Sequence, residues 1–260
     1  MLKGKSAIVT GSTSGIGLGI AETLAAQGVN ILFNGFGDKA AIDAVVADTA
    51  KKFGVKTAYS AADMSKAADI RALVKQAEDT FGAVDILINN AGIQFTSTIE
   101  EFPEEKWDAI IAINLTSAFH AMKAAIPGMK KRNWGRIINI ASAHGLVGSP
   151  NKSAYVAAKH GIVGLTKVAA LEMGDAMITV NAICPGWVMT PLVQKQIDDR
   201  AAKEGKPAKD VGLEMLAEKQ SNGRFSTPEQ MGALAVFLCS DEAINITGTT
   251  HSMDGGWTAH

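Results

Sequence analysis

The chain has 260 residues, of which 47% are apolar and 20% are charged. This length and composition predict one folded domain with a large core, and they exclude a disordered chain. The 25 Lys and Arg against 26 Asp and Glu leave a formal net charge of -1. The chain therefore lacks the basic excess with which proteins hold nucleic acid, and we expect no such partner.

Signals for export, membrane insertion and disulfide bonding are absent from the sequence. The segment 1–10 has no secretory pattern, and no apolar run reaches the ~20 residues that a membrane span needs. Cys184 lies inside an apolar run and Cys239 ends another, so both are expected to be buried free thiols. We expect a cytoplasmic protein with no membrane partner.

Short β-branched segments alternate with longer helical ones along the chain. Apolar residues recur at helical spacing in 42–53 and 70–81, which predicts amphipathic helices. The expected strands are 6–9, 30–34, 56–60, 86–89, 136–141, 179–184 and 249–253. Because these strands are apolar almost throughout, helices should cover both faces of the sheet. The predicted fold is α/β: a single-domain, Rossmann-type, doubly wound parallel sheet of about seven strands.

A glycine-rich turn, TGSTSGIG at 10–17, follows the first strand and opens a helix. Glycines in such a turn let the backbone approach a pyrophosphate, and the free N–H groups of the helix start face the anion. The spacing G-x-x-x-G-x-G differs from the common G-x-G-x-x-G, and a purely structural turn is the alternative. The residues expected to contact a dinucleotide here are Gly11, Thr13, Gly15, Ile16 and Gly17.

The residues around the second strand favour NAD over NADP. NADP needs a cation near the adenosine ribose, commonly in this turn or just after the second strand. The turn offers Ser14, and the strand is followed by Phe36, Gly37 and Asp38. Lys39 is the nearest cation, and Asp38 would repel a phosphate. Phe36 could line the adenine pocket or serve only in packing.

Further cofactor contacts are expected where later strands end. Asp63, after the third strand, could accept a hydrogen bond from the adenine amino group or cap the following helix. Small residues at 89–92 would let the backbone approach a ribose, and 185–187 lies beside the expected nicotinamide position. The remaining contacts are expected from Met64, Asn90, Ala91, Gly92, Pro185, Gly186, Trp187, Val188 and Thr190.

Tyr155 and Lys159 are four residues apart in a predicted helix at 153–173 and share one of its faces. Ser142 ends the fifth strand, at the sheet edge where ligands of α/β proteins bind. A phenol has an ordinary pKa of about 10, but a lysine ammonium and a positive nicotinamide ring would lower it. The three residues suit proton transfer at a substrate oxygen, with Tyr155 as acid and base and Ser142 holding the oxygen.

Together with Asn114, these motifs resemble the short-chain dehydrogenase/reductase family along the whole chain. The resemblance implies that Tyr155 is the general acid/base and that Ser142 orients the substrate. Lys159 would bind the nicotinamide ribose and lower the pKa of Tyr155. Asn114 would hold a water that links Lys159 to solvent. The resemblance also implies a homotetramer.

Polar residues around the predicted tyrosine indicate the substrate class. A cation, an imidazole and two amides suit a small carboxylate, and two tryptophans could supply apolar walls for a short carbon chain. The pocket also resembles members of the family that act on short 3-hydroxy acids. That resemblance implies interconversion of (R)-3-hydroxybutanoate and acetoacetate with NAD. The residues concerned are Gln94, His144, Lys152, Trp187, Gln196 and Trp257.

The charge-rich segment 190–220 is helical in pattern and is interrupted at 205–207. It could be a mobile lid over the substrate or a solvated helical hairpin.

Other functions remain as alternatives. An NADPH-dependent 3-oxoacyl thioester reductase of the same family would need a cation for the 2′-phosphate. A polyol or sugar dehydrogenase has no use for Lys152 as a group that binds an anion. A catalytically silent dinucleotide-binding scaffold need not keep the catalytic residues. The five histidines show no paired-ligand spacing, so we expect no metal.

Overall fold

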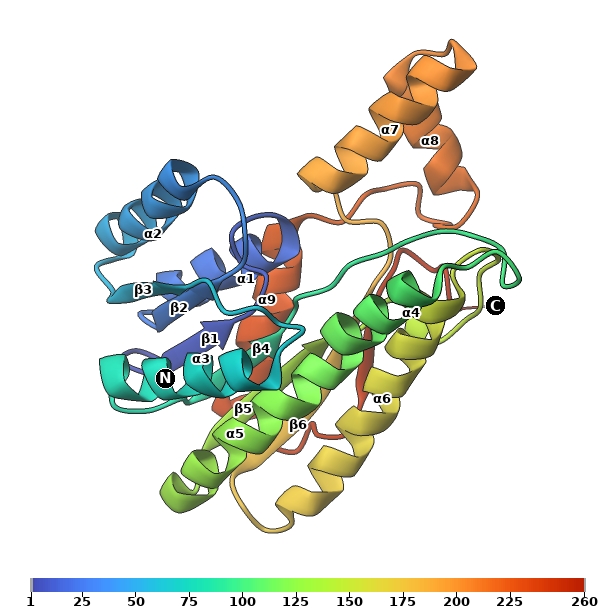
Figure 1. Cartoon of the computed structure of the whole chain (residues 1–260). Coiled ribbons are helices and arrows are strands. Elements are labelled where there is room, and N and C mark those ends of the chain that lie inside the picture. The colour runs from blue at the N-terminus through green and yellow to red at the C-terminus, as the bar shows by residue number, and fades with distance from the viewer. Residues whose placement is uncertain (1, 260) are drawn as a thin grey trace.

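Seven parallel strands form one sheet in the computed structural model, which describes residues 2–259 (Figure 1). The strand order is β3-β2-β1-β4-β5-β6-β7, and every neighbouring pair is parallel. This confirms the predicted Rossmann-type sheet, with strand ends within one residue of those expected. The strands are β1 (Ser6–Val9), β2 (Asn30–Asn34), β3 (Thr57–Ser60), β4 (Ile86–Asn89), β5 (Gly135–Ile140), β6 (Ile178–Pro185) and β7 (Thr250–Met253).

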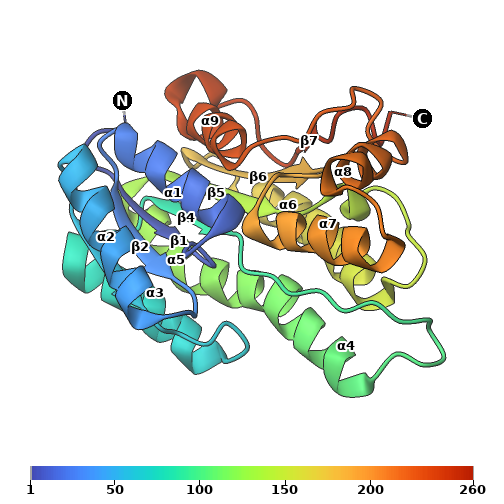
Figure 2. The same cartoon turned by 90° about the horizontal axis from the view of Figure 1, so that it is seen from above.

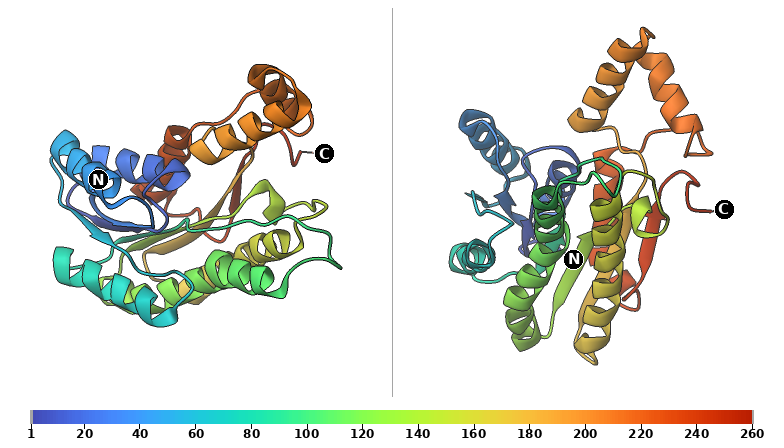
Figure 3. Two further views of the ribbon diagram at one scale, coloured as in Figure 1. Left: turned by 45° about the horizontal axis from the view of Figure 1, so that its top comes forward. Right: turned by 45° about the vertical axis from the view of Figure 1, so that its right-hand side comes forward.

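Helices cover both faces of the sheet, as Figures 2 and 3 show. One layer holds α1 (Gly15–Ala26), α2 (Lys39–Phe53) and α9 (Pro228–Cys239). The other holds α3 (Ala67–Phe81), α4 (Glu104–Ile111), α5 (Ser117–Arg132) and α6 (Ser153–Met173). Each layer encloses its own hydrophobic core, which is why the strands are apolar on both faces.

One long helix in the second layer changes its winding in the middle. Between α4 and α5 the chain forms a π-helical segment, η1 (Ala112–Thr116), so that 104–132 is continuous. This helix is long and apolar enough to cross a membrane, but core helices pass the same test. Ala121, Met122 and Ala125 are buried in the core beneath the sheet, so we assign it to the core.

A helical hairpin of α7 (Pro191–Glu204) and α8 (Ala208–Ala217) projects from the body of the molecule (Figure 1). It has its own small hydrophobic cluster, in which Val193 and Ile197 of α7 pack with Val211 and Met215 of α8. The two segments that join it to the body pair with each other through a bridge between Val188 and Ser226.

Candidate active site

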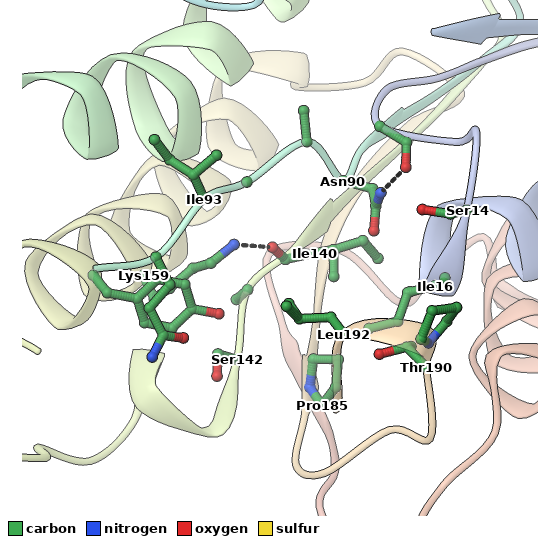
Figure 4. A pocket seen from close by; sticks show the side chains of 18 of the residues that line it. Ser14, Ile16, Asn90, Ile93, Ile140, Ser142, Lys159, Pro185, Thr190 and Leu192 are labelled. Atoms are coloured by element: carbon green, nitrogen blue, oxygen red, sulfur yellow. Dashed lines mark hydrogen bonds between the residues drawn. The ribbon is translucent and has the colours of Figure 1, made fainter. Parts of the chain in front are cut away.

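A cavity of about 330 Å³ opens where β1, β4, β5 and β6 end (Figure 4). This is the sheet edge where α/β proteins bind ligands. The cavity brings together many of the residues expected from sequence: Gly11, Gly15, Ile16, Asn90, Ala91, Gly92, Gln94, Ser142, Tyr155, Lys159, Pro185, Gly186 and Thr190. Residues with no predicted role also line it, namely Ser14, Ile93, Ile140, Ala141, Pro191 and Leu192.

The glycine-rich turn is tied to the end of β4. The Thr10 hydroxyl accepts hydrogen bonds from Asn90 N at 2.9 Å and Ala91 N at 3.0 Å, and Asn90 Nδ2 donates to Gly11 O at 3.0 Å. A Cβ on Gly17 would lie 2.5 Å from Asn90 Nδ2 and would also strike Gly11 O. Only glycine at position 17 allows this close packing.

The start of α1 fits the pyrophosphate of a dinucleotide. Ser14, its N-cap residue, makes no side-chain capping bond, and Gly15 and Ile16 of its first turn line the cavity. Uncapped N–H groups at the positive end of a helix dipole favour an anion. The residues present therefore fit the group that the sequence predicts.

Asn34, at the end of β2, fixes the same turn and was given no role from sequence. Its Oδ1 accepts from Gly11 N at 3.3 Å, and its Nδ2 donates to Ser60 O at 3.1 Å and Ala62 O at 3.0 Å. The side chain is fully buried. A polar residue that ends an apolar strand is the one sequence signal that could have identified it.

The polar groups after β2 are engaged with one another. Asp38 caps α2 by accepting from Ala41 N at 2.9 Å. Lys39, the nearest cation, is paired with Asp43. Phe36 is 67% exposed, so its ring does not serve the core packing considered as an alternative.

Asp63 serves a local turn rather than standing free for a ligand. Its carboxylate accepts from Ser65 N at 2.9 Å and Ser65 Oγ at 2.7 Å, and it lies 3.3 Å from Lys66 Nζ. The hydrogen bonds from Ser65 lower the pKa of Asp63 most. The helix cap considered from sequence is not formed, because Lys66 is the N-cap residue of α3 and the Asp63 carboxylate bonds to Ser65, before the helix begins. The contact with adenine stays a prediction. Neither Asp63 nor the buried Met64 lines the cavity.

The catalytic candidates come from the end of β5 and the first turns of α6. Ser142 is the N-cap of a short 3₁₀ segment, η2 (Ala143–Gly145), and its Oγ accepts from His144 N at 3.2 Å. Lys159 is buried, and its Nζ donates to Ile140 O at 2.7 Å (Figure 4). Burial lowers the pKa of Lys159 to about 8.

The expectation that Lys159 and a positive nicotinamide ring lower the pKa of Tyr155 stays a prediction for the complex with the cofactor. In the structure, burial is the main influence on this pKa. Burial raises the pKa of the phenol, and a hydrogen bond with Ser142 only partly opposes the rise. Lys159 Nζ lies 5.6 Å from the centre of the Tyr155 ring and bonds instead to Ile140 O. The phenol is therefore protonated at neutral pH and is ready to donate a proton.

A buried polar chain holds α6 against the sheet beneath these residues. Asn89 Nδ2 donates to Asn139 Oδ1 at 2.8 Å, and Asn139 Nδ2 donates to Thr166 Oγ1 at 2.9 Å. Thr166 Oγ1 in turn donates to Ile162 O at 2.7 Å. Together with the Lys159–Ile140 bond, the chain fixes the register of α6 along β5.

Asn114 lies in the π-helical segment and binds the loop after β4. Its Oδ1 accepts from Ile93 N at 2.9 Å, and its Nδ2 donates to Ile93 O at 3.0 Å. The side-chain amide thus positions the loop that lines the cavity, and a π-segment at a functional site is a frequent arrangement. The role of Asn114 as a water ligand stays a prediction.

A chain of rings extends from Tyr155 to the predicted substrate residues. The centre of the His144 ring lies 5.9 Å from that of Tyr155 and 4.9 Å from that of Trp257, which is 6.1 Å from Trp187. Lys152 Nζ stands 6.0 Å from the Trp187 ring centre. Burial, and next the charges of Lys152 and Lys219, lower the pKa of His144 to about 4. The imidazole is therefore neutral.

The predicted substrate residues are divided between the cavity wall and the region beside it, and His144, Lys152, Trp187 and Trp257 do not line the cavity. Gln94 lines it and is exposed, whereas Gln196, on α7, does not line it. Thr13 donates to Phe36 O at 3.2 Å, and Val188 is buried in the core. Lys219 has no role predicted from sequence, because only the fold of the hairpin brings it near Trp257.

Comparisons with known proteins agree with this geometry. A family model described as enoyl-(acyl carrier protein) reductase, of the adh_short_C2 type, matches residues 11–258. The chain is 61% identical to a D-beta-hydroxybutyrate dehydrogenase of Cupriavidus necator, covering 100% of both chains. It is 55% identical to one of Rhizobium meliloti, covering 98% of this chain and 99% of the relative. A solved L-sorbose reductase of Gluconobacter frateurii, complexed with NADPH and L-sorbose, superposes with a TM-score of 0.95 at 31% identity, covering 99% of this chain and 98% of that one.

Proposed function

The chain belongs to the short-chain dehydrogenase/reductase family, and from this premise we propose that it interconverts (R)-3-hydroxybutanoate and acetoacetate with NAD as cofactor. The observation that carries the proposal is the ring-lined, basic region of His144, Lys152, Trp187 and Trp257 next to Tyr155. These four residues lie beside Tyr155 but are not among the residues that line the cavity, and a short carboxylate with a nearby hydroxyl suits such a basic, ring-lined region. The names of the two D-beta-hydroxybutyrate dehydrogenases that are 61% and 55% identical to this chain support the substrate and its D configuration.

Tyr155, Ser142 and Lys159 have separate roles in proton transfer at the substrate oxygen. In the reduction direction, Tyr155 donates its phenolic proton to the carbonyl oxygen of acetoacetate, and in oxidation it takes that proton back. Ser142 Oγ, which lines the same cavity as the phenol, holds the same oxygen in place. The buried ammonium of Lys159 stabilises the phenolate that forms when Tyr155 gives up its proton. When bound, the reduced cofactor NADH would supply the hydride for reduction, and NAD⁺ would accept it in oxidation.

The turn after β1 and the loops after β4 and β6 would hold the cofactor. Asn90, Ala91 and Gly92 would lie against a ribose, and Pro185 and Gly186 beside the nicotinamide. The preference for NAD is supported by the absence of a free cation after β2, since Lys39 pairs with Asp43 and Asp38 caps α2. A 2′-phosphate would find no partner there.

The substrate carboxylate would be held by Lys152 and by the neutral imidazole of His144, with amide donors from Gln94 and Gln196. We propose that the α7–α8 hairpin acts as a lid that carries Gln196 toward the site. Leu192, at the start of α7, is 65% exposed and lines the cavity, as does the exposed Ile93. Closure would bury these two side chains against each other and against the substrate.

We also propose a cytoplasmic homotetramer. The two cysteines are buried free thiols, which suits a reducing compartment. An apolar groove runs between α5 and α6, and the exposed Phe119 and Val168 lie on it. An exposed apolar surface of this kind is typical of subunit contacts, and light scattering after gel filtration would give the number of subunits.

The test follows absorbance at 340 nm with NAD and (R)-3-hydroxybutanoate, with the S enantiomer and NADP as controls. We expect turnover with the R enantiomer and NAD only. Tyr155→Phe should lower kcat by about 10³-fold or more, because general acid/base catalysis is worth about 10²–10⁴-fold, while NADH binding measured by fluorescence stays intact. No turnover, combined with reduction of acetoacetyl thioesters by NADPH, would refute the substrate and cofactor and keep the tyrosine chemistry.

A further inference from the structure

Lys219 places a second ammonium group beside the ring-lined region. It follows α8, and its Nζ lies 5.7 Å from the centre of the Trp257 ring. Trp257 packs against both Trp187 and His144, and Lys152 Nζ stands over Trp187. Each of the two lysines therefore faces a different ring of one tryptophan pair.

Neither lysine has a carboxylate partner within residues 2–259. Asp254, near Trp257 in sequence, accepts hydrogen bonds from Gly256 N at 3.1 Å and Thr258 N at 3.0 Å instead. After burial, the charge of Lys219 is the next cause that lowers the pKa of Lys152. Two like charges that repel each other and lack a counter-ion are stabilised by a bound anion.

The backbone at Lys219 is held firmly in place relative to the site. Lys219 N donates to Leu216 O at 3.0 Å. The next residue, Gln220, is fully buried, accepts a hydrogen bond from Trp187 N and donates to Arg224 O at 2.6 Å. Because Gln220 ties this turn to Trp187, Lys219 keeps its position beside the tryptophan pair.

We propose that Lys219 is a second cation for the substrate carboxylate, and that with Lys152 it selects free 3-oxo acids over neutral esters and thioesters. The inference rests on the proposed function, because it concerns the same pocket. It assigns Lys219 to substrate selection rather than to proton transfer. The ester and the acid share the acetoacetyl carbon skeleton but differ by one charge. The ratio of their kcat/KM values therefore isolates the contribution of the lysines.

The test compares reduction of acetoacetate and of methyl acetoacetate by wild type, Lys219→Met, Lys219→Arg and Lys209→Met. Lys209 is an exposed lysine at the other end of α8, so Lys209→Met gives the same change in net charge away from the site. In Lys219→Met we expect the KM for acetoacetate to rise about tenfold, with kcat within about twofold. Lys219→Arg should restore most of the KM, and kcat/KM for the ester should stay at the wild-type value.

A binding measurement separates this proposal from the proposed function. The affinity for acetoacetate in the presence of NAD can be measured from the quenching of tryptophan fluorescence. In Lys219→Met this affinity should fall about tenfold, whether or not turnover occurs. If wild type binds acetoacetate but does not reduce it, the activity is wrong and the affinity ratio still decides the role of Lys219. Wild type that neither binds nor reduces acetoacetate overturns both. Equal behaviour of Lys219→Met and Lys209→Met, or an equal loss on acid and ester, overturns the role of Lys219 alone.

Discussion

Replacing Lys159 by methionine should change how the stability of the protein depends on pH. The ammonium is buried, and its pKa falls from 10.5 to about 8 on folding. Below pH 8 the folded state must keep a charged group in a poorly solvated site, which disfavours folding. As pH rises from 8 toward 10.5 the unfolded chain holds the extra proton, so the free energy of unfolding increases.

The size of this effect follows from the shift. The difference between 10.5 and about 8 corresponds to about 3 kcal/mol of destabilisation at pH 7, at 1.36 kcal/mol per pKa unit. Linkage reduces this to about 1.5 kcal/mol at pH 9.5. Lys159→Met removes the titrating group. The free energy of unfolding of the variant, relative to that of wild type, should therefore be raised at pH 7 by the removal of this penalty. This advantage in the free energy of unfolding should shrink by about 2 kcal/mol between pH 7 and pH 9.5.

Urea unfolding followed by tryptophan fluorescence, at one protomer concentration and with reductant, measures the two proteins side by side. Burial raises the pKa of Cys184 to about 11 and of Cys239 to about 12, so both proteins lose stability as pH passes 9. The difference between wild type and Lys159→Met removes that common contribution, together with any constant loss of the bond to Ile140 O. A difference that stays level within about 0.5 kcal/mol from pH 7 to 9.5 would show that the Lys159 pKa is not depressed.

Three further substitutions test the turn, the buried polar chain and the cofactor preference. Gly17→Ala should cost about 1–3 kcal/mol and weaken NAD binding about tenfold or more, whereas Gly164→Ala, whose Cβ would meet no atom within 4 Å, should leave binding unchanged. Thermal melting without NAD measures the stability of each variant, and the rise in Tm on adding NAD measures its binding. Equal stability and equal NAD binding in Gly17→Ala and Gly164→Ala would contradict the close packing at Gly17. Thr166→Val leaves the buried Asn139 amide N–H without its partner and should lower the free energy of unfolding, measured in urea, by about 1–3 kcal/mol. A change below about 0.5 kcal/mol would show that the hydrogen-bonded series Asn89–Asn139–Thr166 contributes little to stability. Phe36→Arg, at an exposed position, should raise the NADP to NAD ratio of kcat/KM about tenfold, and an unchanged ratio would locate the cofactor preference elsewhere.

The parts of the structure that were predictable from sequence depend on local patterns. The strands stood out because both faces are buried, so that β-branched apolar residues follow one another without interruption. Gly15 and Gly17 were recognisable from their place after β1, and Tyr155 and Lys159 from helical spacing. Such patterns need only neighbours in the chain, and the order of elements then brings their ends to one edge of the sheet.

The remaining features depend on contacts between distant segments. Asn34 acquires its partners only when β2 pairs with β1 and β3. Asn114, in the π-helical segment, binds Ile93 in the loop after β4, and neither the winding nor this contact follows from a local pattern. The neutral His144 and the raised pKa of Tyr155 follow from burial, which the sequence does not quantify. Lys219 reaches Trp257 through the return of the hairpin.

The attachment of the α7–α8 hairpin has a consequence for how such an enzyme can change in evolution. The hairpin has its own hydrophobic cluster, and its two stalks bond to each other, with Met189 N donating to Ser226 O at 2.8 Å and Ser226 N to Trp187 O at 3.0 Å. The two helices therefore pack largely on each other, and a change in the length or sequence of the turn between them at 205–207 would leave the sheet and the proton-transfer residues in place. Substrate range could therefore change through the hairpin helices while Tyr155 and its neighbours on β5 and α6 stay the same, provided that the buried Gln220 and its bond to Trp187 are kept.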